Sequence, residues 1–114
     1  MKRVVVTGLG MINSLGLEKE SAFAAIIEGK CGIKEISAFD TEQHSVKIAG
    51  EITDFDPSTV LDAKEVKKAD RFIQLGMKAA KEAMEDAKIP EGTDMDRFGV
   101  ASASGIGPFI YTLF

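Results

Sequence analysis

The stretch Lys2–Gly16 constrains the fold of this 114-residue chain more than any other segment. Three valines at positions 4–6 form a β-branched run, and such side chains fit the pleated surface of a sheet. Because the run is apolar on both faces, it predicts a strand covered on both sides, as in a parallel α/β sheet. Gly8 and Gly10 follow, and glycine permits a sharp backbone turn where the strand ends. The segment therefore predicts a central strand that runs into a glycine turn.

The two glycines also match the start of the dinucleotide-binding fingerprint G-x-G-x-x-G. That fingerprint needs its third glycine for close packing of a helix on the strand, with pyrophosphate at the helix N-terminus. Here Asn13 occupies the third position, and Ser14 and Gly16 prolong the loop. We therefore favour a structural turn and expect no cofactor. A nucleotide-binding α/β domain remains an alternative, which a measurement of NAD(P) affinity distinguishes.

Composition narrows the class of protein. The chain has 14 basic and 18 acidic residues, a net charge of −4, which gives no case for nucleic-acid binding. Its single cysteine, Cys31, cannot form an internal disulfide and is interpreted as a small structural residue. The only histidine, His44, lies in a polar stretch and cannot supply a metal cluster alone, so we expect no metal site. With no apolar run as long as a membrane span, the expectation is a soluble, cytoplasmic protein.

Local patterns predict several elements in the first half of the chain. Apolar residues sharing one face indicate a helix over Leu17–Glu28, which Gly29 is well placed to end. Alternation over Val46–Ile52 predicts a half-buried strand, whereas residues 33–39 predict a loop. The pair Asp56–Pro57 is typical of a helix N-terminus.

The strongest periodicity predicts a helix from about Lys64 or Asp70 to Ala87. Spacings of three and four predict a buried stripe of Ala69, Phe72, Ile73, Gly76, Ala80, Ala83, Met84 and Ala87. The small residues of this stripe allow another backbone to approach closely. On the opposite face, Lys78–Glu82 and Lys81–Glu85 have the spacing of ion pairs, each worth only about 0.2–0.5 kcal/mol.

After the turn at Pro90–Gly92, the run Phe98–Ala103 predicts a third strand. It enters a second glycine turn at Gly105–Gly107. The combination of strand and glycine turn therefore occurs twice in the chain.

The segment Lys64–Arg71 is a local exception to the acidic balance, because four basic and two acidic residues leave a net charge of +2. One interpretation is a solvated helix surface, since most charged runs only improve solubility. The other is a docking surface for an acidic partner. Cations at a helix N-terminus oppose the helix dipole, and that cost favours a functional reason for their presence.

Four segments occur in the order RVVVTGLGMINSLG, EGKCGI, KEVKKADRFIQLGMKAA and FGVASASGIG. In this combination they resemble the opening of the β-ketoacyl-acyl-carrier-protein synthases, most closely the type II enzymes of bacterial fatty acid synthesis. The resemblance covers Met1 to about Gly107. It implies a thiolase-like fold, in which two similar α/β layers pack as α-β-α-β-α. For this chain it implies a partial α/β fold, part of one α-β-α layer of the N-terminal half.

The resemblance also implies roles for individual residues. Lys64, Lys67 and Lys68 match basic residues with which the family docks the acidic acyl carrier protein. Ile106 matches a residue that lines the acyl-chain pocket near the dimer interface, and intact family members are homodimers. The family condenses an acyl chain, held on a cysteine, with malonyl carried on acyl carrier protein.

The family's nucleophilic cysteine and its two histidines have no counterpart here, and Cys31 and His44 match none of them. The resemblance therefore predicts no catalytic residue in this chain, which we expect to be inactive alone. We expect residues 1–107 to be an incomplete synthase segment and 108–114 to be an apolar tail that departs from the family pattern, as after truncation or a frameshift. A non-catalytic module that docks acyl carrier protein remains the alternative.

Overall fold

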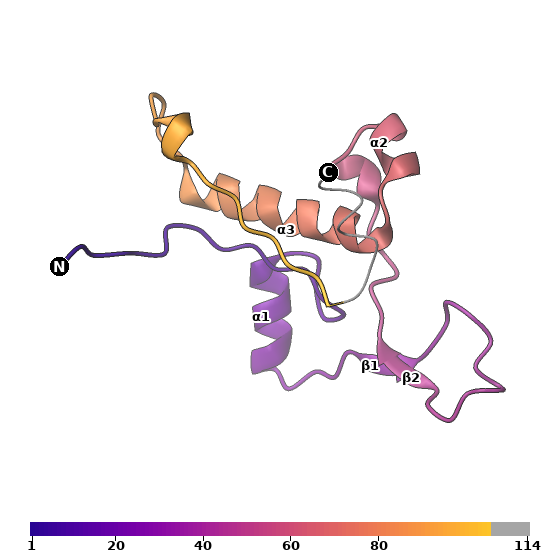
Figure 1. Cartoon of the computed structure of the whole chain (residues 1–114). Coiled ribbons are helices and arrows are strands. Elements are labelled where there is room, and N and C mark those ends of the chain that lie inside the picture. The colour runs from indigo at the N-terminus through magenta and orange to yellow at the C-terminus, as the bar shows by residue number, and fades with distance from the viewer. Residues whose placement is uncertain (106–114) are drawn as a thin grey trace.

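The computed structural model of the protein describes residues 1–105 (Figure 1). Its helices are α1 (Lys19–Ile27), α2 (Ala63–Lys68) and α3 (Arg71–Ala87), with short 3₁₀ helices η1 (Pro57–Thr59) and η2 (Met95–Arg97). The two strands in this part of the chain, β1 (Ile33–Glu35) and β2 (Ile48–Gly50), pair in an antiparallel manner. Helix α3 is the longest element; α2 lies beside one end of it, and the hairpin of β1 and β2 lies apart from it (Figure 1).

The helix expected from Lys64 or Asp70 is in fact two helices, one beginning near each of these residues. Ala69 leaves the helical region with φ −91° and ψ 129°, which ends α2. Asp70, with φ −65° and ψ 159°, is the N-cap of α3. At the other end, Lys88 adopts the left-handed conformation, with φ 49°. Local signals thus located the ends of these helices but not the break between them.

The N-terminal segment runs beside α3, and its glycines permit the close approach (Figure 1). A Cβ atom built on Gly8 would lie 2.6 Å from the backbone nitrogen of Ala87. One built on Gly10 would lie 2.8 Å from the carbonyl carbon of Ala79 and 2.9 Å from the nitrogen of Ala83. Any side chain at either position would therefore overlap the helix backbone.

This close approach corrects the prediction of a glycine turn in the N-terminal segment. Among the described glycines, only Gly29 and Gly92 have positive φ, so the two glycines beside α3 are required by space and not by conformation. Gly29 ends α1 as predicted. The small residues Ala83 and Ala87 of α3 do contact another backbone, that of the N-terminal segment, as predicted. Gly76 and Ala80 of the same predicted stripe lie outside this contact and are exposed.

Two carboxylates one turn apart on α3 fasten the N-terminal segment and α1 to this helix. Glu82 accepts hydrogen bonds from the backbone N–H of Met11 at 2.9 Å and from that of Lys19 at 2.9 Å. Asp86 accepts one from the N–H of Leu9 at 3.0 Å and pairs with the Lys19 ammonium at 2.6 Å. Since the Lys19 N–H is an unpaired donor of the first turn of α1, Glu82 also caps that helix.

These contacts keep both carboxylates ionised. The hydrogen bond from the Lys19 ammonium lowers the pKa of Asp86, and the N–H of Leu9 lowers it further. Partial burial opposes ionisation of Glu82, but hydrogen bonds from the amides of Lys19 and Met11 outweigh it and lower the pKa. The same pairing with Asp86 raises the pKa of Lys19.

Glu82 was expected on the outer face of α3, in an ion pair with Lys78, and this prediction is wrong. Among residues 1–105 neither Lys78–Glu82 nor Lys81–Glu85 forms an ion pair. Lys81 instead donates a hydrogen bond to the carbonyl of Thr59 at 3.3 Å, which ties η1 to α3. Glu82 and Lys81 therefore bind backbone groups of other segments and not the oppositely charged side chains four residues away on α3.

The predicted strands at residues 4–6 and Phe98–Ala103 are wrong for the described chain, because neither segment forms a sheet ladder. A strand exists only when a second strand supplies its hydrogen bonds, whatever its side-chain pattern. The predicted strand over Val46–Ile52 is confirmed in shorter form as β2. Its partner β1 lies in the stretch 33–39 that was expected to be a loop.

The register of this hairpin pairs Ile33 with Gly50, Lys34 with Ala49 and Glu35 with Ile48. The faces differ from the expected half-buried pattern, because Ile33 and Ile48 are exposed while Ala49 is half-buried. Ile33 and Ile48 lie on the same face of the hairpin and are 51% and 56% exposed.

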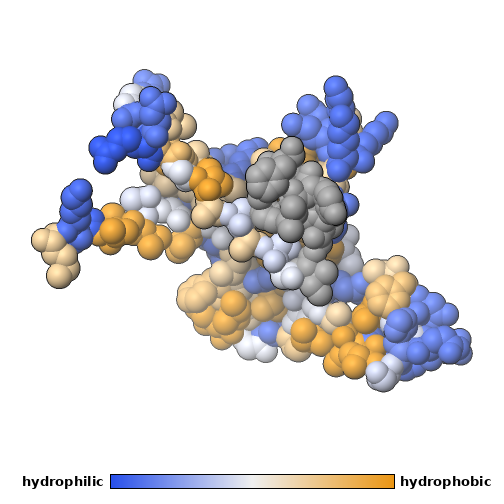
Figure 2. All heavy atoms as spheres, in the orientation of Figure 1, coloured by the Kyte–Doolittle hydropathy of each residue, from blue (hydrophilic) through white to orange (hydrophobic). Residues whose placement is uncertain are grey.

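The described elements leave much apolar surface uncovered. The radius of gyration is 17.0 Å, against about 13 Å for a compact domain of this length. The accessible surface is 9475 Å², against about 6,000 Å² for a folded monomer of this mass. Val4 is 94% exposed, and Phe23 and Ile27 on α1 are exposed as well. Figure 2 shows hydrophobic side chains gathered on these parts of the surface.

An apolar hollow of about 380 Å³ lies between the N-terminal segment and α1. It is lined by Leu9, Gly10, Met11, Lys19, Glu20 and Phe23. Within the described residues, no helix is long and apolar enough to cross a membrane.

The glycine contact predicts opposite effects of alanine at two glycines. We expect Gly10→Ala to destabilise the chain by about 1–3 kcal/mol, because the methyl group overlaps the backbone of α3. The matched control Gly76→Ala should stabilise it by about 0.5–1 kcal/mol, because Gly76 is in the helix interior with open space around it. Urea unfolding midpoints measure both effects. Equal midpoints for Gly10→Ala and the unaltered chain would contradict the packing.

The carboxylate network predicts a loss of stability in acid. Because folding lowers the pKa of Glu82 and Asp86, their contribution is complete above the ordinary carboxyl pKa values. It is lost as the pH falls below about 4, through the pKa values of the folded state. We expect Glu82→Gln/Asp86→Asn to be less stable at pH 7 and less dependent on pH. Urea unfolding from pH 3 to 7 tests this, with exposed Glu91→Gln as the control.

Candidate functional site

The three lysines singled out by the sequence lie together on α2. Lys64 is followed at spacings of three and four by Lys67 and Lys68, so the three side chains share one face of the helix. All three are exposed, and none forms an ion pair with any residue in 1–105. In Figure 2 a group of hydrophilic side chains projects over the region of α2.

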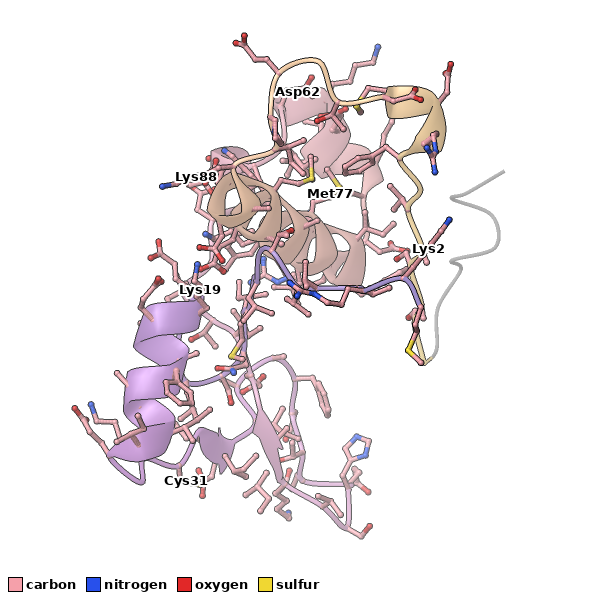
Figure 3. The ribbon with its side chains drawn as sticks, turned by 90° about the vertical axis from the view of Figure 1, so that its left-hand side faces the viewer. Lys2, Lys19, Cys31, Asp62, Met77 and Lys88 are labelled. Atoms are coloured by element: carbon pink, nitrogen blue, oxygen red, sulfur yellow. The ribbon has the colours of Figure 1, made fainter. Side chains whose placement is uncertain are left out.

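Helix α2 is held at its N-terminus by a reciprocal capping box. The Asp62 carboxylate accepts a hydrogen bond from the N–H of Glu65 at 2.8 Å, and the Glu65 carboxylate accepts one from the N–H of Asp62 at 3.4 Å. Figure 3 labels Asp62, the N-cap residue of α2. Lys67 and Lys68 fall in the last turn, where cations complement the helix dipole. The expectation that these two cations oppose the dipole is therefore wrong.

Gln74 of α3 holds the opposite end of α2. Its side-chain amide donates hydrogen bonds to the carbonyl of Val66 at 3.3 Å and to that of Ala69 at 3.2 Å. The Val66 carbonyl is among the last four of the helix, which have no partner within the helix itself. Gln74 is 8% exposed and is the buried polar side chain of the described residues.

Arg71 connects this junction to the segment after β2. One nitrogen of its guanidinium, Nη2, donates to the carbonyl of Ile52 at 3.0 Å, and Nη1 donates to that of Phe55 at 3.4 Å. The guanidinium carbon also lies 5.2 Å from the centre of the Phe55 ring, within the range of a cation–π contact. Nη1 is 3.5 Å from the Gln74 side-chain oxygen. Arg71 and Gln74 thus join α2, α3 and the chain that follows the hairpin.

The remaining candidate residues do not gather around α2. Ile106 lies outside the described residues. Cys31 is exposed beyond the far end of α1 from Lys19, and its sulfur is 4.0 Å from the carbonyl of Ile33 (Figure 3). His44 is exposed and packs edge to face against Phe39, with ring centres 5.3 Å apart. The interpretation of Cys31 as a structural residue and not a nucleophile stays a prediction.

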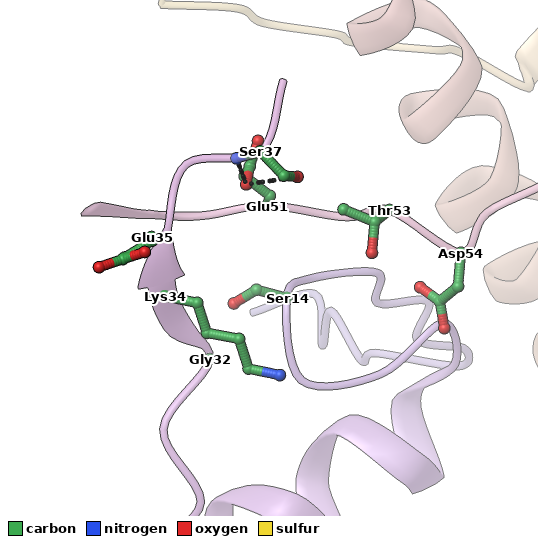
Figure 4. Close-up of a pocket in the computed structure, with 8 residues that line it drawn as sticks. All are labelled: Ser14, Gly32, Lys34, Glu35, Ser37, Glu51, Thr53 and Asp54. Atoms are coloured by element: carbon green, nitrogen blue, oxygen red, sulfur yellow. Dashed lines mark hydrogen bonds between the residues drawn. The ribbon is translucent and has the colours of Figure 1, made fainter. Parts of the chain in front are cut away.

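A polar pocket of about 400 Å³ lies beside the hairpin (Figure 4). It is lined by Ser14, Gly32, Lys34, Glu35, Ser37, Glu51, Thr53 and Asp54. Glu51 already accepts hydrogen bonds from the N–H of Ser37 at 2.8 Å and from that of Ala38 at 3.1 Å. The Ser37 N–H is the main cause of its lowered pKa. The Ser37 hydroxyl also donates a hydrogen bond to Glu51, at 3.1 Å. Glu51 therefore organises the loop through both groups of Ser37, and the lining residues include no histidine or cysteine.

The N-terminal glycines do not form a phosphate cradle. Their Cα atoms face the middle and the C-terminal part of α3, whereas a dinucleotide fingerprint places glycines at a helix N-terminus. This geometry contradicts the nucleotide-binding interpretation. Within residues 1–105, no group of three or more His, Cys, Asp or Glu side chains could hold a metal ion.

Sequence reasoning missed the two residues that position α2. Gln74 lies within the segment KEVKKADRFIQLGMKAA, but the apolar periodicity gave a polar side chain there no special meaning. The available signal was its spacing: Arg71 and Gln74 are three residues apart on one helix face, directly after the helix break. The three lysines form an exposed cationic surface on a short helix that is held at both ends, and the charge of this surface is complementary to that of an anionic protein.

Comparisons with known proteins agree with the resemblance. The family model described as "Beta-ketoacyl synthase, N-terminal domain" matches residues 1–112. Curated relatives named 3-oxoacyl-[acyl-carrier-protein] synthase 2 include that of Coxiella burnetii, 43% identical over 107 residues, and that of Vibrio harveyi, 42% identical over 108. The enzyme of the same name from Staphylococcus aureus strain COL is 42% identical over 108 residues. Each match covers 93% of this chain and 26% of the relative, so the chain spans about a quarter of their length.

The capping box predicts that α2 can be loosened separately from α3. Asp62→Ala should cost about 0.5–2 kcal/mol, because it leaves the N–H of Glu65 without its partner. We expect faster hydrogen exchange at the amides of α2 and little change in α3. Asp54→Ala is the matched control, since Asp54 is exposed and forms no hydrogen bond or ion pair with the described residues. Equal exchange in both variants would show that the cap does not hold the helix.

Proposed function

Because the chain belongs to the β-ketoacyl synthase family, we propose that it is the N-terminal segment of a 3-oxoacyl-[acyl-carrier-protein] synthase of type II in fatty acid synthesis. Its own contribution is the docking of acyl carrier protein on α2. The observation that carries the proposal is the placement of Lys64, Lys67 and Lys68 on one exposed helix face without counter-charges among residues 1–105.

The charges explain why an acidic carrier protein is a suitable partner. The whole chain is acidic, so a local cluster of three lysines orients an approaching anionic protein toward α2. Exposed lysines keep their hydration before binding and lose it only in the contact, so their main effect is on the rate of association and on orientation. Both effects weaken as salt screens the charges.

The condensation chemistry is assigned to residues outside this stretch. A condensing enzyme needs a thiolate to hold the acyl group and donors to stabilise the enolate formed from malonyl. Cys31 and His44, the only cysteine and histidine, lie in separate loops, and neither lines the polar pocket beside the hairpin. We therefore expect the chain to bind acyl carrier protein without forming an acyl-enzyme.

The same proposal covers the finer features of the resemblance. Residues 1–107 would belong to one α-β-α layer of a thiolase-like fold, with 108–114 as the departing tail and Ile106 lining the acyl pocket. The uncovered apolar side chains of α1 offer surface for the remainder of that layer or for the second subunit of a homodimer.

Charge reversal on α2 tests the docking proposal. We expect Lys64→Glu/Lys67→Glu/Lys68→Glu to abolish binding of a bacterial acyl carrier protein, because three attractive contacts become repulsive. For the unaltered chain, binding should weaken steadily between about 50 and 300 mM salt. Fluorescence anisotropy of labelled carrier protein measures the dissociation constant in each case.

The matched control reverses three lysines elsewhere, in Lys2→Glu/Lys34→Glu/Lys47→Glu, which gives the same net charge. All three control positions are exposed and lie away from α2. Binding that is retained in the control and lost in the α2 variant supports a localised docking surface. Equal loss of carrier-protein binding in both variants would show that binding depends on net charge alone and would contradict a localised docking surface.

A further inference from the structure

We propose that Gln74 and Arg71 are positioning residues for the docking surface: through the end of α2 they fix the direction in which Lys64, Lys67 and Lys68 point. This inference rests on the proposed docking function. It assigns a role to two side chains that do not belong to the cationic surface and, in this proposal, do not touch the carrier protein.

The first argument is that α2 cannot hold its own shape. A helix of six residues is far below the length at which isolated helices form in water. All of its residues are exposed except Val66, which is half-buried, so packing supplies little of its stability. Its order must therefore depend on hydrogen bonds at its two ends.

The second argument is that Gln74 supplies the C-terminal bonds and has no other evident use. Its two donors reach Val66 and Ala69, while its oxygen faces the Arg71 guanidinium. Burial of an amide is costly unless its groups are paired, and here both kinds of group have partners. A buried amide at this junction fixes the angle between α2 and α3 more strictly than an apolar contact would.

The third argument is that Arg71 makes the junction rigid. Its guanidinium presents donors in a fixed planar fork, which binds the carbonyls of Ile52 and Phe55 from one side chain. The Phe55 ring beside it is 7% exposed and belongs to the small core of the described residues. Arg71 thus connects the Gln74 side chain, which binds the end of α2, to the core residue Phe55, so the direction of α2 is fixed relative to the core.

Carrier-protein binding to variants of the 114-residue chain tests the inference. Gln74→Met keeps the length of the side chain and removes both donors, so a smaller fraction of the chain holds α2 in the binding geometry. Apparent affinity falls by that fraction, and we expect a dissociation constant raised about tenfold. Gln43→Met, the same change at an exposed loop position, should leave it unaltered.

Two further variants separate positioning from a general loss of stability. Gln74→His at pH 8 restores one N–H donor at similar reach and should recover part of the affinity. Arg71→Lys keeps the charge but loses the planar fork, and it should weaken binding in the same direction as Gln74→Met. If Gln74→Met fails to fold, which far-UV circular dichroism of the whole chain reveals, Arg71→Lys still provides the test.

The outcomes distinguish this inference from the docking proposal. If charge reversal on α2 abolishes binding while folded Gln74→Met and Arg71→Lys bind like the unaltered chain, docking stands and the positioning role is overturned. If charge reversal leaves binding unchanged, both fail. Weaker binding by Gln74→Met and Arg71→Lys, with partial recovery in Gln74→His, supports the positioning role.

Discussion

The structure depends most on two carboxylates, Glu82 and Asp86, which lie one turn apart on α3 and bind the N-terminal segment and the start of α1. Between them they accept hydrogen bonds from three backbone amides and bind one ammonium, so that the N-terminal segment and α1 meet at the same turn. The arrangement works only because Gly8 and Gly10 bring the segment's backbone against the helix. Charge-assisted bonds to backbone N–H groups are stronger than neutral ones, which lets a small contact area hold two segments.

Features coded by neighbouring residues were predictable from the sequence. Gly29 ends α1, Pro57 begins η1, and the α3 periodicity located the longest helix. The strands were not predictable in the same way, because pairing depends on a distant partner. The valines at residues 4–6 have a strong β pattern and no ladder in the described chain, whereas Ile33 in a weaker pattern has one.

The residues of the candidate site also differ in whether the sequence could predict them. Lys64, Lys67 and Lys68 were found because charge density is visible in the sequence and helical spacing puts them on one face. Gln74 and Glu82 were not found, because each binds backbone atoms of another segment, Gln74 of the preceding helix and Glu82 of the distant start of α1. Backbone carbonyls and amides are the same at every residue, so the partners of such side chains leave no trace in the amino-acid sequence. For Gln74, the spacing of three residues from Arg71, directly after the helix break, is the available signal.

Helix α3 separates the two junctions. Near the N-terminal end of α3, Gln74 binds the end of α2. Eight residues later, about 12 Å along the axis of α3, Glu82 binds α1 and the N-terminal segment. At that distance, with no shared partner, energetic effects of substitutions usually add. The network at Glu82 therefore sets whether the segment stays on the helix, while the junction at Gln74 sets where the lysines point. If the three lysines dock a partner, as we propose, substitutions at the Gln74 junction change their direction without disturbing the packing around Glu82.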